Sequence, residues 1–165
     1  MCELLAISAS APVNIKLSLC ELARHGGETG IHSDGWGTQH FSTGATYGSP
    51  RARCIGVFAM GPLLQRHTNQ SSTMIAHIRH ATRGADSLAN TQPFVRELGG
   101  RVHVFAHNGH SGEAIPADAL SGQCYQPIGE TDSEAAFCHL MQRFAARREQ
   151  TTSKRSGIFQ RLRAK

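Results

Sequence analysis

Apolar residues near the start of the chain form two patterns, one typical of a strand and the other of a helix. Residues 3–8 are a mostly apolar run of strand length, and Pro12 predicts the end of that strand. Over residues 15–24 the apolar positions favour a short helix, which Gly26 and Gly27 are expected to end. The apolar contacts expected from this helix are those of Leu17, Leu19, Leu22 and Ala23.

Further along the chain, strand-like runs alternate with segments rich in glycine and proline. A hairpin turn is expected at residues 42–44 after strand-like sequence, and residues 47–50 are predicted to be a loop. Residues 52–65 carry an interrupted apolar run that we expect to be irregular or weakly helical. Two more strands are predicted at residues 74–79 and 102–107.

The C-terminal part of the chain predicts loops and one long helix. Residues 82–93 are a polar loop without a regular period. Thr131 with Glu134 forms a capping-box pattern, which predicts a helix through about residue 148. The sequence therefore predicts one domain over residues 1–150 and an irregular basic tail over residues 151–165.

Length and composition fit a single globular domain. The chain has 165 residues, of which 39% are hydrophobic and 18% charged. No apolar run approaches the roughly eighteen residues needed to span a bilayer, and Glu3 interrupts the first apolar stretch before it would serve as a secretory signal. The 5 cysteines lack CxxC spacing and predict neither a disulfide framework nor a zinc knuckle. We therefore expect a single-domain protein of the cytoplasm, with no membrane partner.

The positive net charge is confined to the C-terminal end of the chain. Residues 141–165 hold eight Lys and Arg against one acidic residue, whereas residues 1–140 hold nine against eleven. A basic tail can attract nucleic acid or an acidic membrane surface. The tail has no recognised motif for reading nucleic acid, so we expect a solvated end and no nucleic-acid partner.

Cys2 stands directly behind the initiator methionine. Once that methionine is removed, the thiol and the free α-amine belong to one residue. An α-amine with an ordinary pKa of about 8 can accept the proton of the thiol and return it to a leaving group. Cys2 is therefore a candidate nucleophile. The alternative is a cysteine that merely opens an ordinary first strand.

Three later segments carry polar groups that suit one small ligand. Arg79 ends a predicted strand and Thr82 lies on the turn beyond it, a position from which a guanidinium can grip a carboxylate. Asn108 and Gly109 end another strand and offer a side-chain amide and a backbone N–H to an oxyanion. Asp132, at the start of the last helix, is a possible counter-ion for an ammonium group. Structural alternatives remain for each segment: a surface arginine, a tight Asn-Gly turn and an ordinary helix start.

Trp36 lies between Gly35 and Gly37, where the indole offers a flat wall and the glycines permit a close backbone approach.

Taken together, the segments that contain Arg79, Asn108 and Asp132 describe a ligand with a carboxylate, an ammonium group and a reactive carbonyl a few carbons away. An amino acid with a side-chain amide has these groups, and glutamine fits.

The 10 histidines offer a second interpretation. HxxH spacings occur at His77 and His80 and at His107 and His110, and such spacings are compatible with a zinc hydrolase. No supporting acid motif such as HExxH accompanies them. We therefore expect no metal and no other cofactor.

The motifs MCELLAIS, HSDGWG, HIRHATRG, NTQPF, HNG and ETDSE occur in this order over most of the chain. In this order they resemble the class II glutamine amidotransferases, whose nucleophile is an N-terminal cysteine. Within that family the chain is most similar to the small stand-alone branch related to γ-glutamyl hydrolases. The resemblance implies the α+β fold of the N-terminal nucleophile (Ntn) hydrolases, an αββα sandwich. It implies glutamine or a γ-glutamyl compound as the substrate, and it leaves a synthase partner and the oligomeric state open.

The resemblance also assigns roles to residues by their position in these motifs. They are, in chain order, Cys2 as nucleophile, Trp36 and Gly37 as lining near it, Arg79 and Thr82 for the glutamine carboxylate, Asn108 and Gly109 as oxyanion hole, and Asp132 for the α-ammonium group. Asn90, Gln92 and Pro93 match a loop that supports the carboxylate-binding segment.

The chain is shorter than the family's usual domain, because the strands and helices that follow the ETDSE helix have no counterpart in it. We therefore expect a sandwich that is incomplete at its C-terminal end. Two functions are compatible with this: an enzyme that hydrolyses a side-chain amide through a Cys2 thioester, or an inactive remnant that binds a ligand or a partner.

Overall fold

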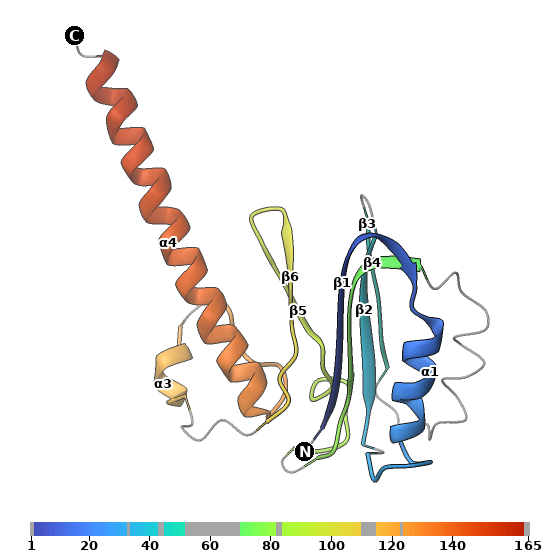
Figure 1. Cartoon of the computed structure of the whole chain (residues 1–165). Coiled ribbons are helices and arrows are strands. Elements are labelled where there is room, and N and C mark those ends of the chain that lie inside the picture. The colour runs from blue at the N-terminus through green and yellow to red at the C-terminus, as the bar shows by residue number, and fades with distance from the viewer. Residues whose placement is uncertain are drawn as a thin grey trace.

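The computed structural model describes residues 2–32, 34–42, 45–51, 70–81, 84–109, 115–122 and 124–163. Its elements are shown in Figure 1. In chain order they are β1 (Glu3–Asn14), α1 (Lys16–His25), β2 (Trp36–Ser42), β3 (Ala45–Arg51), β4 (Gln70–Ile78), β5 (Phe94–Leu98), β6 (Arg101–Phe105), α3 (Ala117–Leu120) and α4 (Asp132–Arg163).

The larger sheet is four-stranded and antiparallel, in the order β1-β4-β2-β3. Near the C-terminal end of the inner strand β4, His77 pairs with Leu4 of β1 on one side and with Gly37 of β2 on the other. Because β1 begins at the end of the sheet where β4 finishes, the N-terminus of the chain lies beside the residues that follow β4.

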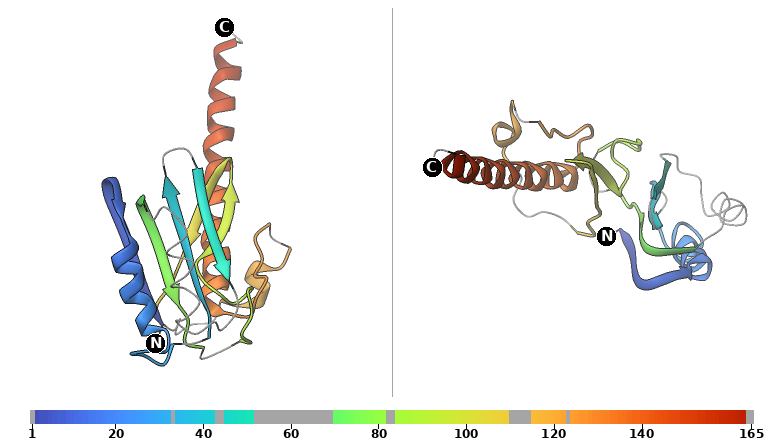
Figure 2. Two further views of the ribbon diagram at one scale, coloured as in Figure 1. Left: turned by 90° about the vertical axis from the view of Figure 1, so that its right-hand side faces the viewer. Right: turned by 90° about the horizontal axis from the view of Figure 1, so that it is seen from above.

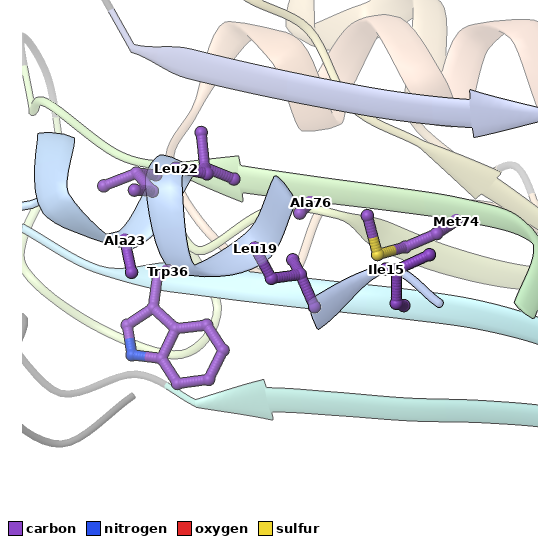
Figure 3. Close-up of a cluster of buried hydrophobic side chains, with 8 residues drawn as sticks. Ile15, Leu19, Leu22, Ala23, Trp36, Met74 and Ala76 are labelled. Atoms are coloured by element: carbon purple, nitrogen blue, oxygen red, sulfur yellow. The ribbon is translucent and has the colours of Figure 1, made fainter. Parts of the chain in front are cut away.

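Helix α1 covers one face of this sheet (Figure 1). Successive residues of a strand point to opposite faces, so Met74, Ala76 and Ile78 of β4 face the helix together. Figure 3 shows the buried cluster that results. Its members are Ile15, Leu19, Leu22, Ala23, Trp36, Met74, Ala76 and Ile78. His77, between two of these residues, belongs to the opposite face of the sheet.

A second core lies between the β5–β6 hairpin and α4. Phe94 of β5 packs with Phe137 and Met141 of α4, and Phe105 of β6 stacks on Phe137 with ring centroids 5.2 Å apart. Figures 1 and 2 show four successive layers: α1, the large sheet, the hairpin and α4. The described chain is therefore a mixed α and β fold with two sheets, each covered by one helix.

The segment between β4 and β5 joins the two cores. The Gln92 Oε1 atom accepts a hydrogen bond of 2.6 Å from the His107 backbone N–H, beyond the end of β6. Gly37 lies so close to the Gln92 carbonyl that a Cβ atom at this position would overlap it. The Gln92–Pro93 peptide bond is cis.

Several predicted elements are confirmed, namely α1, β2, β4, β6 and the start of α4. The predicted end of β1 at Pro12 is wrong, because the strand continues to Asn14 past a register shift between Ser8 and Val13. β1 is an edge strand, where proline removes no ladder hydrogen bond. Leu17 is also misassigned: its side chain is 83% exposed, whereas Leu19 and Leu22 are buried.

The loop predicted at residues 47–50 is wrong as well. These residues belong to β3, the other edge strand of the sheet, which again tolerates the proline. Strand β5 and helix α3 are absent from the prediction. The irregular or weakly helical segment expected at residues 52–65 lies outside the described residues.

Helix α4 continues to Arg163, where the sequence predicts an irregular tail from residue 151. Residues 149–163 contain no proline and a single glycine, Gly157, and good helix formers such as Arg, Gln, Lys and Leu are frequent. Of the helices in the described ranges, none combines the length and the apolar character that crossing a membrane requires.

Candidate active site

The Cys2 thiol lies against the backbone of the residue that follows Arg79. Its Sγ atom accepts a hydrogen bond of 3.4 Å from the His80 N–H and lies 3.6 Å from the His80 carbonyl oxygen, to which it donates. The sheet register explains this position: Glu3 pairs with Ile78, so the next residue outward on each strand brings Cys2 opposite Arg79. Cys2 and Arg79, 77 positions apart in the sequence, are therefore brought together by β1 and β4.

The Arg79 side chain is buried and held by groups of the surrounding loops. Its Nη1 donates to Asp86 Oδ1 at 2.8 Å and to the Asp34 carbonyl oxygen at 3.4 Å, and its Nη2 donates to the Gly84 carbonyl oxygen at 2.9 Å. The Arg79 backbone also bonds the segment before β2, donating to Gly35 O at 2.7 Å. Arg79 thus fixes the arrangement of two loops at this end of the sheet.

Asn90 supports the loop that contacts Arg79. Its Nδ2 donates to the Ala85 carbonyl oxygen at 2.9 Å, and its Oδ1 accepts from the Glu130 N–H at 2.7 Å. The buried Asn90 amide therefore ties the loop beside Arg79 to the segment just before α4. This agrees with the expectation that the NTQPF segment supports the neighbourhood of Arg79.

Asp34 and His80 form a polar pair on the same side of the sheet end. Asp34 Oδ2 accepts a hydrogen bond of 2.6 Å from the Ala81 N–H and lies 3.5 Å from His80 Nδ1. The His32 ring meets the His80 ring edge-on, with centroids 5.7 Å apart. The backbone of residues 80 and 81, beside Cys2, is thereby held by a carboxylate from the loop before β2.

Asn108 and Gly109 follow β6 and are exposed. The residue before them, His107, is anchored from two directions: its N–H bonds Gln92, and its Nδ1 lies 3.1 Å from the Ser133 Oγ. Ser133 is next to Asp132, whose Oδ1 accepts from the Ser133 N–H at 2.8 Å. The His107–Ser133 contact therefore brings the segment of Asn108 next to that of Asp132.

His77 lies at the junction of these segments and is only 1% exposed. In the part of the chain that the structure describes, neither of its ring nitrogens makes a hydrogen bond. Burial lowers the pKa of His77 from 6.5 to about 4. The charge of Arg79 and the His107 imidazole also lower this pKa, whereas the nearby His107 backbone raises it. The HxxH spacing indicates His77 only as a possible zinc ligand and does not predict its position between these segments.

The remaining predicted site residues fall in different places. Trp36 belongs to the core beneath α1, on the sheet face opposite to His77, so its indole packs with that core. Gly37 is on the His77 side, against the Gln92 carbonyl. Thr82 lies outside the described residues, as does His110. Within the described ranges no group of three or more His, Cys, Asp and Glu side chains is arranged to hold a metal ion.

The family model of the class II glutamine amidotransferases matches residues 1–164. The chain belongs to this family. It is 38% identical over 161 residues to "Putative glutamine amidotransferase YafJ" of Escherichia coli, a match that covers 96% of this chain and 61% of that protein. It is 36% identical over 140 residues to "Putative glutamine amidotransferase" of Haemophilus influenzae, covering 85% of this chain and 47% of that protein.

A solved structure supports the same relationship. The crystal structure of a predicted glutamine amidotransferase from Pseudomonas aeruginosa PA01 matches with a TM-score of 0.50 and 32% identity, over 86% of this chain and 54% of that chain. The chain therefore spans about half to three fifths of the length of the proteins it matches.

Proposed function

We propose that this chain hydrolyses the side-chain amide of glutamine, or of another γ-glutamyl compound, through a thioester on Cys2. The observation that carries the proposal is the position of the Cys2 thiol, 3.4 Å from the His80 amide and thus directly beside Arg79. A nucleophile next to a buried guanidinium suits a substrate whose reactive carbonyl and carboxylate belong to one small molecule. Membership of the family makes glutamine the natural substrate class.

The reaction begins with removal of Met1, which frees the α-amine of Cys2. The amine takes the thiol proton, and the thiolate attacks the amide carbon of the substrate. Asn108 and Gly109 donate hydrogen bonds to the oxyanion that forms. The protonated amine then gives its proton to the departing nitrogen, so ammonia leaves and a γ-glutamyl thioester remains. Water attacks the thioester, which releases glutamate and restores the thiol.

Arg79 and Thr82 would hold the substrate carboxylate, and Asp132 the α-ammonium group. The contacts His77–His107 and His107–Ser133 support this assignment, because they connect the strand pair that carries Cys2 and Arg79 with the segment of Asn108 and the start of α4. Asp132 is acidic and lies at the N-terminal end of a helix, where the helix dipole favours a negative charge.

The order of layers supports an Ntn-type αββα sandwich as the scaffold. α1, the large sheet, the hairpin and α4 follow one another in Figures 1 and 2, and Cys2 lies at the start of a strand in an inner layer. In this proposal residues 1–150 form the N-terminal part of the glutamine amidotransferase domain, and an acceptor for the ammonia or a synthase partner is not required for hydrolysis.

The test is covalent labelling with a diazoketone analogue of glutamine, followed by mass spectrometry of the peptides. We expect one adduct on residue 2 of a chain that lacks Met1, with loss of the adduct in Cys2→Ser. Cys124→Ser is the matched control, because Cys124 is an exposed thiol outside the proposed site, and it should label like the wild type. No adduct, or an adduct on Cys124 alone, would contradict hydrolysis and favour a remnant that only binds.

A further inference from the structure

The guanidinium of Arg79 already holds a carboxylate, that of Asp86. The Nη1–Oδ1 distance is 2.8 Å, and the side chains differ greatly in exposure, 4% for Arg79 and 51% for Asp86. A buried positive charge is thus neutralised by an acid that reaches in from the loop surface. An arginine with this environment presents the same planar donors to any carboxylate that takes the place of Asp86.

Asp86 is a partner of Arg79 that a ligand can displace. Two further acceptors of Arg79 are backbone carbonyl oxygens, of Asp34 and Gly84, whose movement would require the loops to refold. Rotation of the Asp86 side chain requires no such change. Its neighbour Ala85 stays fixed, because its carbonyl oxygen accepts from Asn90 and its N–H lies 3.4 Å from Glu130 Oε2.

We propose that Asp86 is an internal competitor for the substrate carboxylate at Arg79. This inference rests on the proposed function, in which Arg79 receives that carboxylate. Two carboxylates at one guanidinium repel each other, so the substrate must displace Asp86 into solvent before it binds. Asp86 therefore sets the affinity of the site for carboxylates and holds Arg79 in place while the site contains no substrate.

The test compares binding of L-glutamate to Asp86→Asn and to the parent chain by titration calorimetry, in a Cys2→Ser background that cannot form the thioester. Asn keeps an oxygen for the Arg79 N–H and removes the competing charge. We expect binding about fivefold tighter, the effect of removing a half-exposed ion pair that the ligand must break. Asp86→Glu, which restores a carboxylate, should return the affinity toward the parent value.

Glu28→Gln is the matched control, since it removes an exposed acid from another arginine pair, Arg24–Glu28, and changes the net charge equally. It should leave the glutamate affinity unchanged. Thermal melting of each variant verifies folding. If folded Asp86→Asn binds glutamate no more tightly than the parent, or if the gain persists when Arg79→Lys is added, the inference is overturned.

The labelling of Cys2 separates this inference from the proposed function. If Asp86→Asn binds glutamate more tightly but Cys2 forms no adduct, Asp86 is a competitor at Arg79 and the proposed hydrolysis is wrong. If Cys2 forms the adduct but Asp86→Asn binds glutamate with unchanged affinity, the hydrolysis is supported and Asp86 is not a competitor.

Discussion

At the scale of single residues, the unusual feature is the deeply buried imidazole of His77. His77 contributes its ring to the face of the large sheet that meets the His107 segment, and its neighbours on the strand contribute to the apolar core under α1. A ring that is 1% exposed loses the hydration that its charged form needs, so burial favours the neutral imidazole. The stability of the protein should therefore depend on the protonation of this one residue.

Acid should destabilise the fold through His77. Its pKa is 6.5 in the unfolded chain and about 4 in the folded one, so the unfolded state binds more protons between these values. The stability that comes from neutral His77 is complete above pH 6.5 and falls as the pH approaches 4. At pH 4.5 the loss should be about 2.5 kcal/mol.

The measurement is urea unfolding at pH 7 and pH 4.5. In His77→Gln, which does not titrate, the difference between the two free energies of unfolding should shrink by about that amount. His25→Gln, at a partly exposed histidine of α1, should retain the full difference. Equal pH dependence in all three proteins would mean that His77 is accommodated as a charged residue.

Single residues of the candidate site could be predicted where a motif stands at the end of a predicted strand. Cys2 and Arg79 have such positions, and the pairing of β1 with β4, which the sequence does not show, brings them together. Asp86 and His77 were not predictable, because their importance comes from loops and layers that meet only in the folded chain. The face of the sheet to which Trp36 points could not be predicted either, since a shift of one residue in the strand moves every side chain to the opposite face.

At the scale of elements, the start of α4 is the best-defined junction. The predicted capping box is half formed: Thr131 Oγ1 accepts from the Glu134 N–H at 3.2 Å. The Glu134 carboxylate instead accepts hydrogen bonds from the backbone N–H groups of Ile128 and Gly129. It also pairs with Arg96 of β5 at 2.5 Å. One buried acid thus fixes the loop before α4, the helix start and the hairpin.

Glu134→Gln should destabilise the protein by about 3 kcal/mol, because it leaves the Arg96 guanidinium without its carboxylate partner beside α4. The Glu134 side chain is 1% exposed, so water offers little compensation. Glu130→Gln, a change at an exposed acid four positions earlier, should cost much less. Chemical denaturation of the two variants gives the comparison, and similar losses would show that the buried pair has no special role.

The same ion pair explains why β5 was missed among elements that were otherwise largely predictable. The strand turns Phe94, Arg96 and Leu98 toward α4, and a charged residue at an inward position interrupts the apolar alternation by which a strand is recognised. α1 and β4 have no such interruption on their core faces, and both were predicted correctly. The local sequence pattern identifies a helix or strand only where the buried positions of that element are apolar.

At the scale of the whole molecule, two cores share one set of connections. The first lies between α1 and the large sheet and contains Trp36, and the second lies between the hairpin and α4 next to the buried Cys138. They meet where Gly37 packs against the Gln92 carbonyl and where Gln92 bonds His107. Because these contacts are close and buried, we expect the two cores to unfold as one unit.

Two probes report on the two cores separately. Trp36 is the only tryptophan in the chain, so its fluorescence follows the first core. Cys138 is buried and its burial raises the pKa of the thiol, so its alkylation follows the opening of the second core. In a urea series, pulse alkylation of Cys138 and fluorescence of Trp36 should give coincident midpoints.

Gly37→Ala tests the connection directly, because a Cβ atom at this position overlaps the Gln92 carbonyl. The β2 backbone and the Gln92–Pro93 segment must then separate, which should lower both midpoints together. If the change moved only the Trp36 transition, or if the two wild-type transitions were already distinct, the cores would be independent. In that case Cys2 and Arg79, which belong to the sheet, would not be held in fixed positions relative to Asn108 and Asp132, and the proposed active site would need another means of assembly.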